Sequence, residues 1–127
     1  MAGKPRFFIC KHCGNMVVMI EDHGPPLVCC GENMTELVAN TEEASVEKHL
    51  PDVTVSGDSI NVQVGSAPHP MLEAHHITFV FVETEHGNQL KSFEIGDEPK
   101  AAFNFLGDKP VAVYAYCNLH GLWKTEV

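Results

Sequence analysis

Five cysteines and eight histidines stand among the 127 residues of the chain, and several of them have the spacing of metal ligands. The first cluster combines C-K-H-C with a later C-C pair, which places four thiols at Cys10, Cys13, Cys29 and Cys30. Four thiolates form a complete tetrahedral ligand set, which suits zinc or a single iron. Gly14 is expected to help close the loop between Cys10 and Cys13. The adjacency of Cys29 and Cys30 predicts a distorted tetrahedron.

A second metal site of a different kind is predicted around the fifth cysteine. Cys117 stands three residues before His120 in C-N-L-H-G, so one loop can direct both side chains at one ion. His69 lies between two prolines, which restrict the backbone and present the imidazole rigidly. On a strand, His75 and His76 would point to opposite faces, so only one of them can share a site with His69.

A site with four imidazoles and one thiolate would leave a six-coordinate metal ion one open position. This arrangement permits inner-sphere chemistry on a small ligand, and a thiolate opposite the opening pushes electron density through the metal, as in haem-thiolate enzymes. The fourth imidazole could come from His49, at the end of a polar linker that could fold over the second domain. The histidines expected to be solvated are His12, His23 and His86.

The elements that must position these residues are predicted to be short strands in two domains, residues 1–37 and 38–127. The first domain alternates apolar runs with Cys-Gly and Gly-Pro-Pro turns. Fewer than about 40 residues rarely fold on hydrophobic burial alone, so a metal held by four thiolates is expected to supply the missing free energy. Residues 41–48 are expected to form a linker with one helical turn. From Val53 onward, about seven apolar runs at near-regular spacing predict an antiparallel β-sandwich.

The overall composition limits the classes of partner. The formal net charge is −9, from 17 acidic and 8 basic residues, so nucleic acid is not an expected partner, because phosphate binding needs clustered Lys and Arg. No run approaches the roughly 18 apolar residues of a membrane span. No apolar stretch precedes Cys10, so a secretory signal is not expected either. The odd number of cysteines and the missing signal favour metal ligands in a reducing cytoplasm over disulfides.

These motifs together resemble the desulfoferrodoxin family, the two-iron superoxide reductases, and the resemblance covers nearly the whole chain. The desulforedoxin-like N-terminal domain of that family, which holds a single iron, is similar to the segments Cys10-x-x-Cys13 and Cys29-Cys30-Gly31. Its catalytic domain is similar to the segments Glu47-Lys48-His49, His69-Pro-Met-x-x-x-His75 and Tyr116-Cys-Asn-Leu-His-Gly-x-Trp123-Lys124.

The resemblance implies an Ig-like β-sandwich, a homodimer and two iron ions per chain, one Fe(Cys)4 and one Fe(His)4Cys. It selects His75 rather than His76 as a ligand. Two positions depart from the family pattern, since His76 stands where relatives commonly carry an aromatic residue and Leu122 where many carry histidine. The implied catalytic iron has Cys117 as its axial ligand and, in a plane, His49, His69, His75 and His120.

The implied activity is the one-electron reduction of superoxide to hydrogen peroxide at ferrous iron, in a cytoplasmic enzyme that detoxifies superoxide. A rubredoxin-like donor would restore the ferrous state. By resemblance, Lys48 is the cation that attracts superoxide and organises water as a proton source. Glu47 resembles the carboxylate that closes the sixth position of the oxidised iron. The first iron would either pass electrons or hold the small domain and the dimer together.

Other functions are compatible with parts of the sequence. An electron carrier is one: blue-copper proteins also combine Cys and His from one C-terminal loop with an upstream His, but they usually add a Met soon after the loop histidine, and no Met follows Met71. A zinc-binding interaction module would explain the first four cysteines but not the other motifs. Superoxide dismutase activity would require the iron to oxidise superoxide as well as to reduce it.

Overall fold

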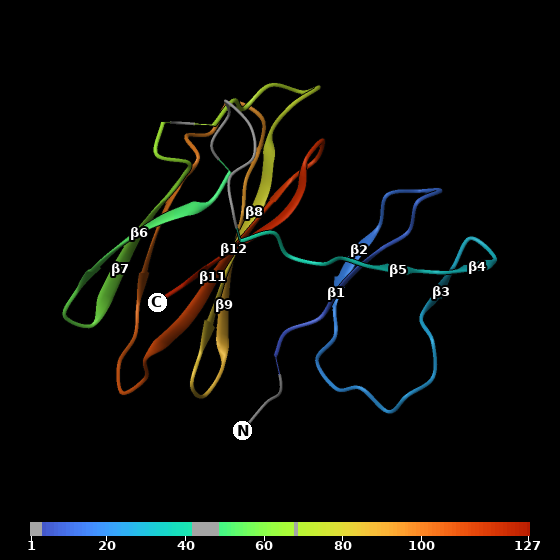
Figure 1. The fold of residues 1–127 in the computed structure, drawn as a ribbon, viewed down its shortest axis with the longest axis horizontal. Helices are drawn as coiled ribbons and strands as arrows, with labels where there is room; N and C mark the ends of the chain where they lie inside the picture. Colours follow the sequence, from blue (N-terminus) through green and yellow to red (C-terminus); the bar gives the residue numbers. More distant parts are fainter. Residues whose placement is uncertain (1–3, 42–48, 68) are drawn as a thin grey trace. The chain divides into compact units, whose positions relative to one another are not determined.

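The computed structural model describes residues 4–41, 49–67 and 69–127, and their regular structure consists of β-strands joined by turns and loops (Figure 1). This confirms the mainly β fold class. In these ranges no helix has the length and hydrophobicity needed to cross a membrane. The chain divides into two compact units, Ala2–Val38 and Ala39–Val127. The helical turn expected in the linker lies outside the described residues.

The small unit holds two little sheets made of very short strands. One sheet has the order β2-β1-β5 and the other is the hairpin β3-β4. Among the described residues of this unit, only Phe7, Phe8 and Cys10 are buried. So small a core offsets little of the entropy lost on folding. The strands are β1 (Phe7–Ile9), β2 (Met16–Val18), β3 (Val28–Cys29), β4 (Glu32–Asn33) and β5 (Thr35–Glu36).

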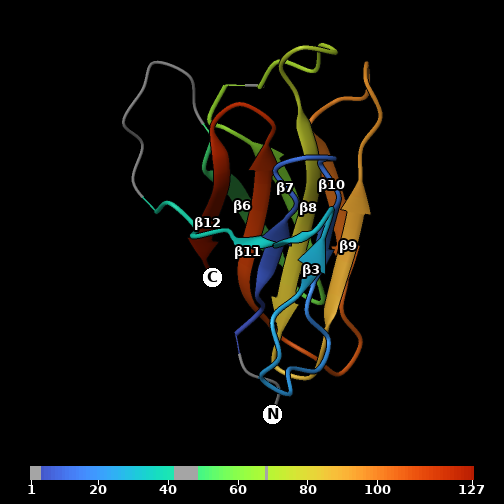
Figure 2. The ribbon, with the colours of Figure 1, turned by 90° about the vertical axis from the view of Figure 1, so that its right-hand side faces the viewer.

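The large unit is a sandwich of two antiparallel sheets. A three-stranded sheet has the order β10-β7-β6, and a four-stranded sheet has the order β12-β11-β8-β9, whose strands run side by side in Figure 2. Each apolar run predicted from Val53 onward falls in or beside one of these strands, so the antiparallel sandwich is confirmed. The strands are β6 (Pro51–Ser56), β7 (Ser59–Val64), β8 (Ile77–Thr84), β9 (Asn88–Ser92), β10 (Lys100–Asn104), β11 (Pro110–Cys117) and β12 (Gly121–Glu126).

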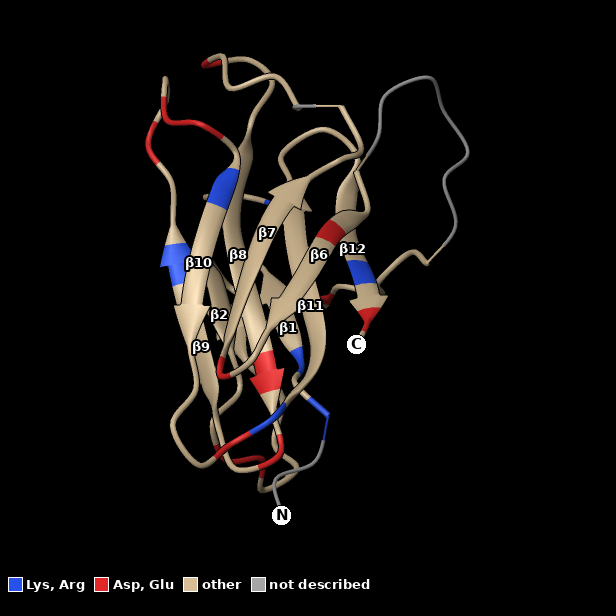
Figure 3. Ribbon diagram, turned by 90° about the vertical axis from the view of Figure 1, so that its left-hand side faces the viewer, with Lys and Arg blue, Asp and Glu red and all other residues tan. Residues whose placement is uncertain are grey.

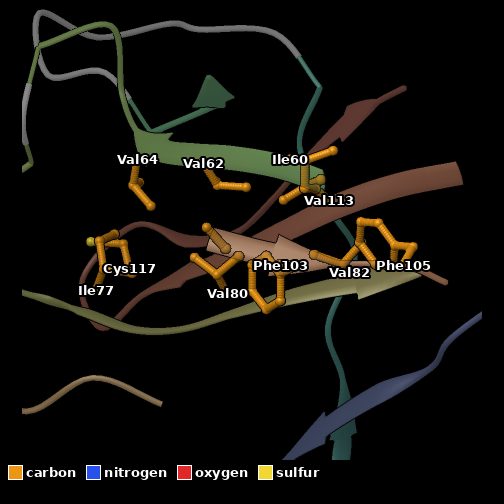
Figure 4. Packing of buried hydrophobic residues seen from close by; sticks show 11 residues of the cluster. Ile60, Val62, Val64, Ile77, Val80, Val82, Phe103, Phe105, Val113 and Cys117 are labelled. Atoms are coloured by element: carbon orange, nitrogen blue, oxygen red, sulfur yellow. The ribbon is translucent and has the colours of Figure 1, made fainter. Parts of the chain in front are cut away.

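The core of the sandwich forms where alternating side chains of the two sheets meet. β7 directs Ile60, Val62 and Val64 inward, as expected for a period of two, and β8 places Val80 against them. Figure 4 shows these side chains between the sheets, with Cys117 at one end of the row. The side chain of Cys117 is 0% exposed. The hydrophobic core therefore encloses this thiol.

A β-bulge marks the end of the sandwich that carries Cys117. From Ala112 to Tyr116, β11 pairs regularly with β8, and Tyr116 stands opposite Phe79, but the next pair joins Ile77 with Cys117. Thr78 is therefore an extra residue, and such an insertion bends a strand and increases its twist. At this same end β7 leads into β8 and β11 turns into β12 (top of Figure 2). The two loops that carry most of the candidate histidines therefore meet here.

Candidate metal centres

The four N-terminal cysteines come together at the ends of two turns and form a group that we call the four-thiol centre. Their sulfur atoms lie within 4.8 Å of one another, with Cys13 Sγ 3.6 Å from Cys29 Sγ and Cys29 Sγ 4.0 Å from Cys30 Sγ. Two sulfur atoms that each lie about 2.3 Å from one tetrahedral ion are about 3.8 Å apart, so this group fits a single ion. All the cysteines of the chain are free thiols, which contradicts the disulfide alternative.

Two tight turns present these thiols. The N–H of Gly14 donates to the carbonyl of Cys10 at 2.8 Å, which closes the loop as predicted, and the N–H of Cys10 donates to the carbonyl of Asn15 at 2.8 Å. Cys30 and Gly31 form the two-residue loop of the β3–β4 hairpin, with φ angles of 53° and 77°. Two positive φ angles at these positions define a type I′ turn. Cys30 is the one non-glycine residue with positive φ in the described part of the chain.

Hydrogen bonding separates the pKa values of these thiols. A hydrogen bond with the backbone of Cys13 is the main cause that lowers the pKa of Cys10 to about 6. Hydrogen bonds with Cys10 and Cys13 raise the pKa of Cys29 to about 12, and the pKa of Cys30 rises for the same reason. Cys10 therefore loses its proton readily, whereas the loss of a proton from Cys29 or Cys30 becomes less favourable. Four thiolates coexist here only around a cation, so metal binding must displace protons.

The second group, which we call the imidazole–thiolate centre, lies at the bulged end of the sandwich. Its four imidazole rings form a closed ring, in which each has two neighbours. The ring centroids are 4.9 Å apart for His49 and His69, 4.7 Å for His69 and His75, 5.1 Å for His75 and His120, and 4.7 Å for His120 and His49. His49 therefore lies across the ring from His75, and His69 lies across from His120. The ligand atoms of these four residues and of Cys117 all lie within 4.8 Å of one another.

The distances in this group fit one metal ion. His49 Nε2 lies 3.0 Å from His120 Nδ1, and two nitrogens at about 2.1 Å from an ion and at a right angle are about 3.0 Å apart. Cys117 Sγ lies 3.6 Å from the same nitrogen of His120. Cys117 is fully buried, whereas His75 is half-buried and His120 is exposed. The sulfur therefore approaches from the core, and solvent reaches the ring from the other side. Imidazole nitrogens with a thiolate suit iron.

Neighbouring groups hold the imidazoles in place. The Nδ1–H of His69 donates to the carbonyl of Pro70 at 2.8 Å, so Nε2 is the nitrogen that would bind a metal ion. The indole of Trp123 stacks on His49, with a centroid distance of 4.8 Å and an interplanar angle of 15°. Its Nε1–H donates to the carbonyl of His120 at 3.1 Å. Trp123 therefore supports two of the four imidazoles, a role that its spacing in the sequence does not predict.

The other predicted site residues are accounted for as follows. Glu47 and Lys48 lie outside the described residues. His76 does not join the group, because its Nδ1 lies 3.0 Å from the carbonyl of Leu72 and 3.1 Å from that of Glu73. The group therefore contains one of the two adjacent histidines, His75, and both of them precede strand β8, which begins at Ile77.

The three histidines expected to be solvated are exposed, and each lies near a carboxylate. The nitrogen–oxygen distances are 3.0 Å for His12 and Glu32, 3.3 Å for His23 and Glu21, and 3.3 Å for His86 and Asp108. Asp108 also accepts a hydrogen bond from Thr84 Oγ1 at 2.6 Å, which is the main cause that lowers its pKa. None of these histidines belongs to the two metal centres described above.

A β-sandwich with four imidazoles and a thiolate gathered at one end, attached to a small unit with four gathered thiols, defines a non-haem iron protein with two centres. Residues 3–37 match the family model of the desulfoferrodoxin N-terminal domain, and residues 41–126 match that of desulfoferrodoxin. The chain belongs to the desulfoferrodoxin family. Its four-thiol and imidazole–thiolate centres are the two iron sites of such a protein.

Individual relatives agree with this assignment. The chain is 40% identical over 126 residues to the desulfoferrodoxin of Syntrophotalea carbinolica, with 99% of each chain covered. A solved superoxide reductase from Treponema pallidum superposes with a TM-score of 0.83 at 32% identity, covering 97% of this chain and 98% of that one. A superoxide reductase from Giardia intestinalis described as 1Fe-SOR gives a TM-score of 0.56 at 31% identity, covering 64% of this chain and 97% of that one.

Proposed function

We propose that this chain is a superoxide reductase and that the reaction takes place at the imidazole–thiolate centre. The observation that carries the proposal is the position of Cys117, whose fully buried sulfur lies beneath a ring of four imidazoles that solvent reaches from the other side. The match to superoxide reductase structures supports it. The proposed ligands of the catalytic iron are His49, His69, His75, Cys117 and His120.

The four imidazoles and the thiolate have different roles at the proposed catalytic site. These five residues would hold an iron ion and would leave a six-coordinate ion one position for a small anion. The thiolate of Cys117 would donate electron density to the bound iron, and the burial of Cys117 keeps its sulfur away from water and competing oxidants. Superoxide takes up one electron and two protons to become hydrogen peroxide, and bound ferrous iron supplies the electron.

The charge of the chain makes a local cation necessary. A net charge of −9 repels superoxide at long range, and the basic residues visible in Figure 3 lie on several different strands and loops. We assign the attraction of superoxide and the ordering of a proton-donating water to Lys48, and the closing of the sixth position after oxidation to Glu47. Both assignments come from the family motif Glu47-Lys48-His49.

The assignment of the activity to the predicted domain 38–127 is also a proposal. The Giardia intestinalis superoxide reductase described as 1Fe-SOR is almost fully covered by the match but accounts for only 64% of this chain. The existence of this shorter superoxide reductase supports the proposal that the sandwich can act without the predicted domain 1–37. A rubredoxin-like donor, a homodimer and a cytoplasmic location complete the proposal.

The stoichiometry of superoxide consumption tests the activity. With an electron donor in excess, the reduced protein is expected to form one hydrogen peroxide per superoxide and no dioxygen. Cys117→Ser should abolish this reaction and the thiolate-to-iron charge-transfer absorption of the oxidised imidazole–thiolate centre. His86→Gln, which changes an exposed histidine outside both metal centres, should behave like the parent chain. Release of dioxygen with half the peroxide would instead establish a dismutase.

The role of Lys48 is tested by the rate of superoxide capture at low ionic strength. Lys48→Ile should slow capture about tenfold or more and leave the iron content unchanged, because only a local cation is removed. Lys91→Ile on strand β9 makes the same change in net charge away from the two metal centres and should slow capture much less. Equal capture rates for the parent and Lys48→Ile would overturn the assignment.

Cys13→Ser tests whether the first centre is an obligatory relay. Loss of one of the four thiols should empty or alter the four-thiol centre. If the sandwich acts by itself, the reduced variant should still capture superoxide at the parental rate. Loss of this single-turnover reaction would show that the two centres depend on each other.

A further inference from the structure

We propose that Asn118 is a positioning residue that fixes His75 relative to Cys117 and His120, and so controls how tightly the imidazole–thiolate centre holds its metal. The proposal rests on the ligand assignment above but not on the identity of the substrate. Asn118 is half-buried and lies in the loop between two of the ligands. Its backbone N–H and both polar atoms of its side chain form hydrogen bonds to the segment that carries a third ligand, His75.

Three hydrogen bonds join Asn118 to that segment. The N–H of Asn118 donates to the carbonyl of His76 at 3.1 Å. Its Oδ1 accepts the N–H of His76 at 2.8 Å, and its Nδ2 donates to the carbonyl of Ala74 at 3.1 Å. The side chain therefore bonds to the residue before His75 and to the residue after it.

The local fold makes these bonds necessary. The segment Leu72–His75 closes on itself, since the N–H of Leu72 donates to the carbonyl of His75 at 2.9 Å and the N–H of His75 donates to the carbonyl of Leu72 at 3.1 Å. These bonds fix the shape of the turn but not its distance from the Cys117–His120 loop. The regular pairing of β8 with β11 has already been interrupted by the bulge at Thr78. The hydrogen bonds of Asn118 therefore continue to join the two segments beyond the bulge at Thr78.

The chemistry of the side chain is specific. A carboxamide offers an acceptor and a donor at once, and both are used here. An aspartate at this position would keep the acceptor for His76 N–H but would oppose a carboxylate to the carbonyl of Ala74. A leucine has nearly the same shape and offers neither group. A ligand that is held less firmly binds metal more weakly, and loss of such outer hydrogen bonds typically costs about 10- to 100-fold in metal affinity.

The test compares Asn118→Leu and Asn118→Asp with the parent in the full-length iron-loaded protein. Each protein is challenged with a ferrous chelator, and iron loss from the two centres is followed separately by their absorption spectra. The imidazole–thiolate centre should hold iron about 10- to 100-fold more weakly in Asn118→Leu, with an intermediate loss in Asn118→Asp. The thiolate-to-iron charge-transfer band of the oxidised centre should also shift in energy.

The four-thiol centre serves as an internal reference, and Asn61→Leu and Asn61→Asp provide matched controls at an exposed position of β7. Iron retention and band position equal to the parent in both Asn118 variants would overturn the proposal. A loss of iron from both centres in step with a lower unfolding temperature would also overturn it, since it would show general destabilisation. If Asn118→Leu fails to fold, Asn118→Asp decides the question. None of these readouts uses superoxide, so they stand whatever the substrate is.

Discussion

The two metal centres of this chain depend on their surroundings in opposite ways. In the small unit, Cys13 and Cys30 are exposed, and the described core amounts to two phenylalanines and one ligand. In the sandwich, Cys117 belongs to a cluster of 11 buried residues that spans both sheets. The four-thiol centre must help to create the fold that presents it, because so little apolar surface is buried. The imidazole–thiolate centre is presented by a fold that hydrophobic burial can support.

Removal of both metals should reveal the largest difference in stability between the two units. Chelation in the full-length protein is expected to unfold residues 4–38, because the strands there have only two or three residues and only Phe7, Phe8 and Cys10 are buried among the described residues of this unit. The sandwich should remain folded. Amide hydrogen exchange by NMR would show complete loss of protection in β1, β2 and β5, with protection retained in β7, β8 and β11.

Reloading with iron or zinc should restore protection in the small unit, which controls for irreversible damage. Protection of β1 that survives chelation would mean that the small unit folds without metal. The contrast between the two units would then be wrong.

Acidification should release metal from the four-thiol centre much more steeply than from the imidazole–thiolate centre. An ordinary thiol has a pKa of about 8.5 and an ordinary imidazole one of about 6.5, so between pH 8 and 7 mainly thiols must lose protons to bind metal. Since Cys10 has a pKa lowered to about 6, about three thiols contribute. The metal affinity of the four-thiol centre should fall about 1,000-fold over this unit of pH, and that of the imidazole–thiolate centre about tenfold.

Competition with a metal chelator of known affinity at several pH values measures both slopes. Because Cys10 gains a proton only near and below about pH 6, the slope of the four-thiol centre should become steeper at the more acidic end, where a fourth proton must be displaced. Equal slopes at the two centres would contradict the contrast in ligand charge. A shallow slope at the four-thiol centre alone would mean that its thiols are already ionised before metal binds.

Substitution of Trp123 tests how far the sandwich alone holds the imidazole–thiolate centre. Trp123→Ala removes a nearly buried aromatic ring and should lower the free energy of unfolding by about 3–5 kcal/mol. It should also weaken iron binding, since His49 loses its stacking partner. Trp123→Phe keeps a ring over His49 but loses the bond to the carbonyl of His120, which is worth about 1 kcal/mol.

Thermal unfolding and the charge-transfer band of the oxidised imidazole–thiolate centre separate these effects. The absorption of the four-thiol centre should be unchanged in both variants and serves as the control. A Trp123→Ala variant with parental stability and spectrum would show that the imidazoles are held without the indole.

The sequence predicts the ligand types better than it predicts the groups that hold them. Spacing proposed a thiol set at Cys10 and Cys13 and a separate site at Cys117, and periodicity proposed the sandwich, because both signals are local along the chain. The stacking of Trp123 on His49 and the side-chain hydrogen bonds of Asn118 join segments about 40 or more residues apart. Such contacts depend on the β-bulge and on how the loops meet, which no local pattern specifies.

The choice between His75 and His76 shows the same limit. Alternation on a strand required one of the two but could not say which, and only the family motif selected His75. The structure resolves the choice through the turn that begins at Leu72, whose carbonyl lies 3.0 Å from His76 Nδ1. The roles of Glu47 and Lys48 stay predictions from the motif.

The smallest expected effect concerns the polar contacts that supplement the weak core of the small unit. Arg6 donates from Nε and Nη2 to Glu36, both at 2.9 Å, and also pairs with Asp22. The hydrogen bond with Arg6 is the main cause that lowers the pKa of Glu36. A carboxyl whose pKa is lower in the folded state adds stability above its unfolded pKa of about 4.3, and that stability is lost as the pH falls through the lowered value.

Arg6→Gln should therefore speed amide exchange in β1 and β5 of the metal-loaded protein by only about two- to fivefold near neutral pH, because exposed ion pairs contribute little. The difference from the parent should shrink in high salt and vanish at a pH below the lowered pKa of Glu36. Lys4→Gln removes the same charge two residues earlier and provides the control. Loss of iron from the four-thiol centre in Arg6→Gln, with Lys4→Gln unaffected, would show that this ion-pair network and not the metal is the main support of the small unit. The contrast between a metal-supported unit and a core-supported unit would then have to be redrawn around Arg6.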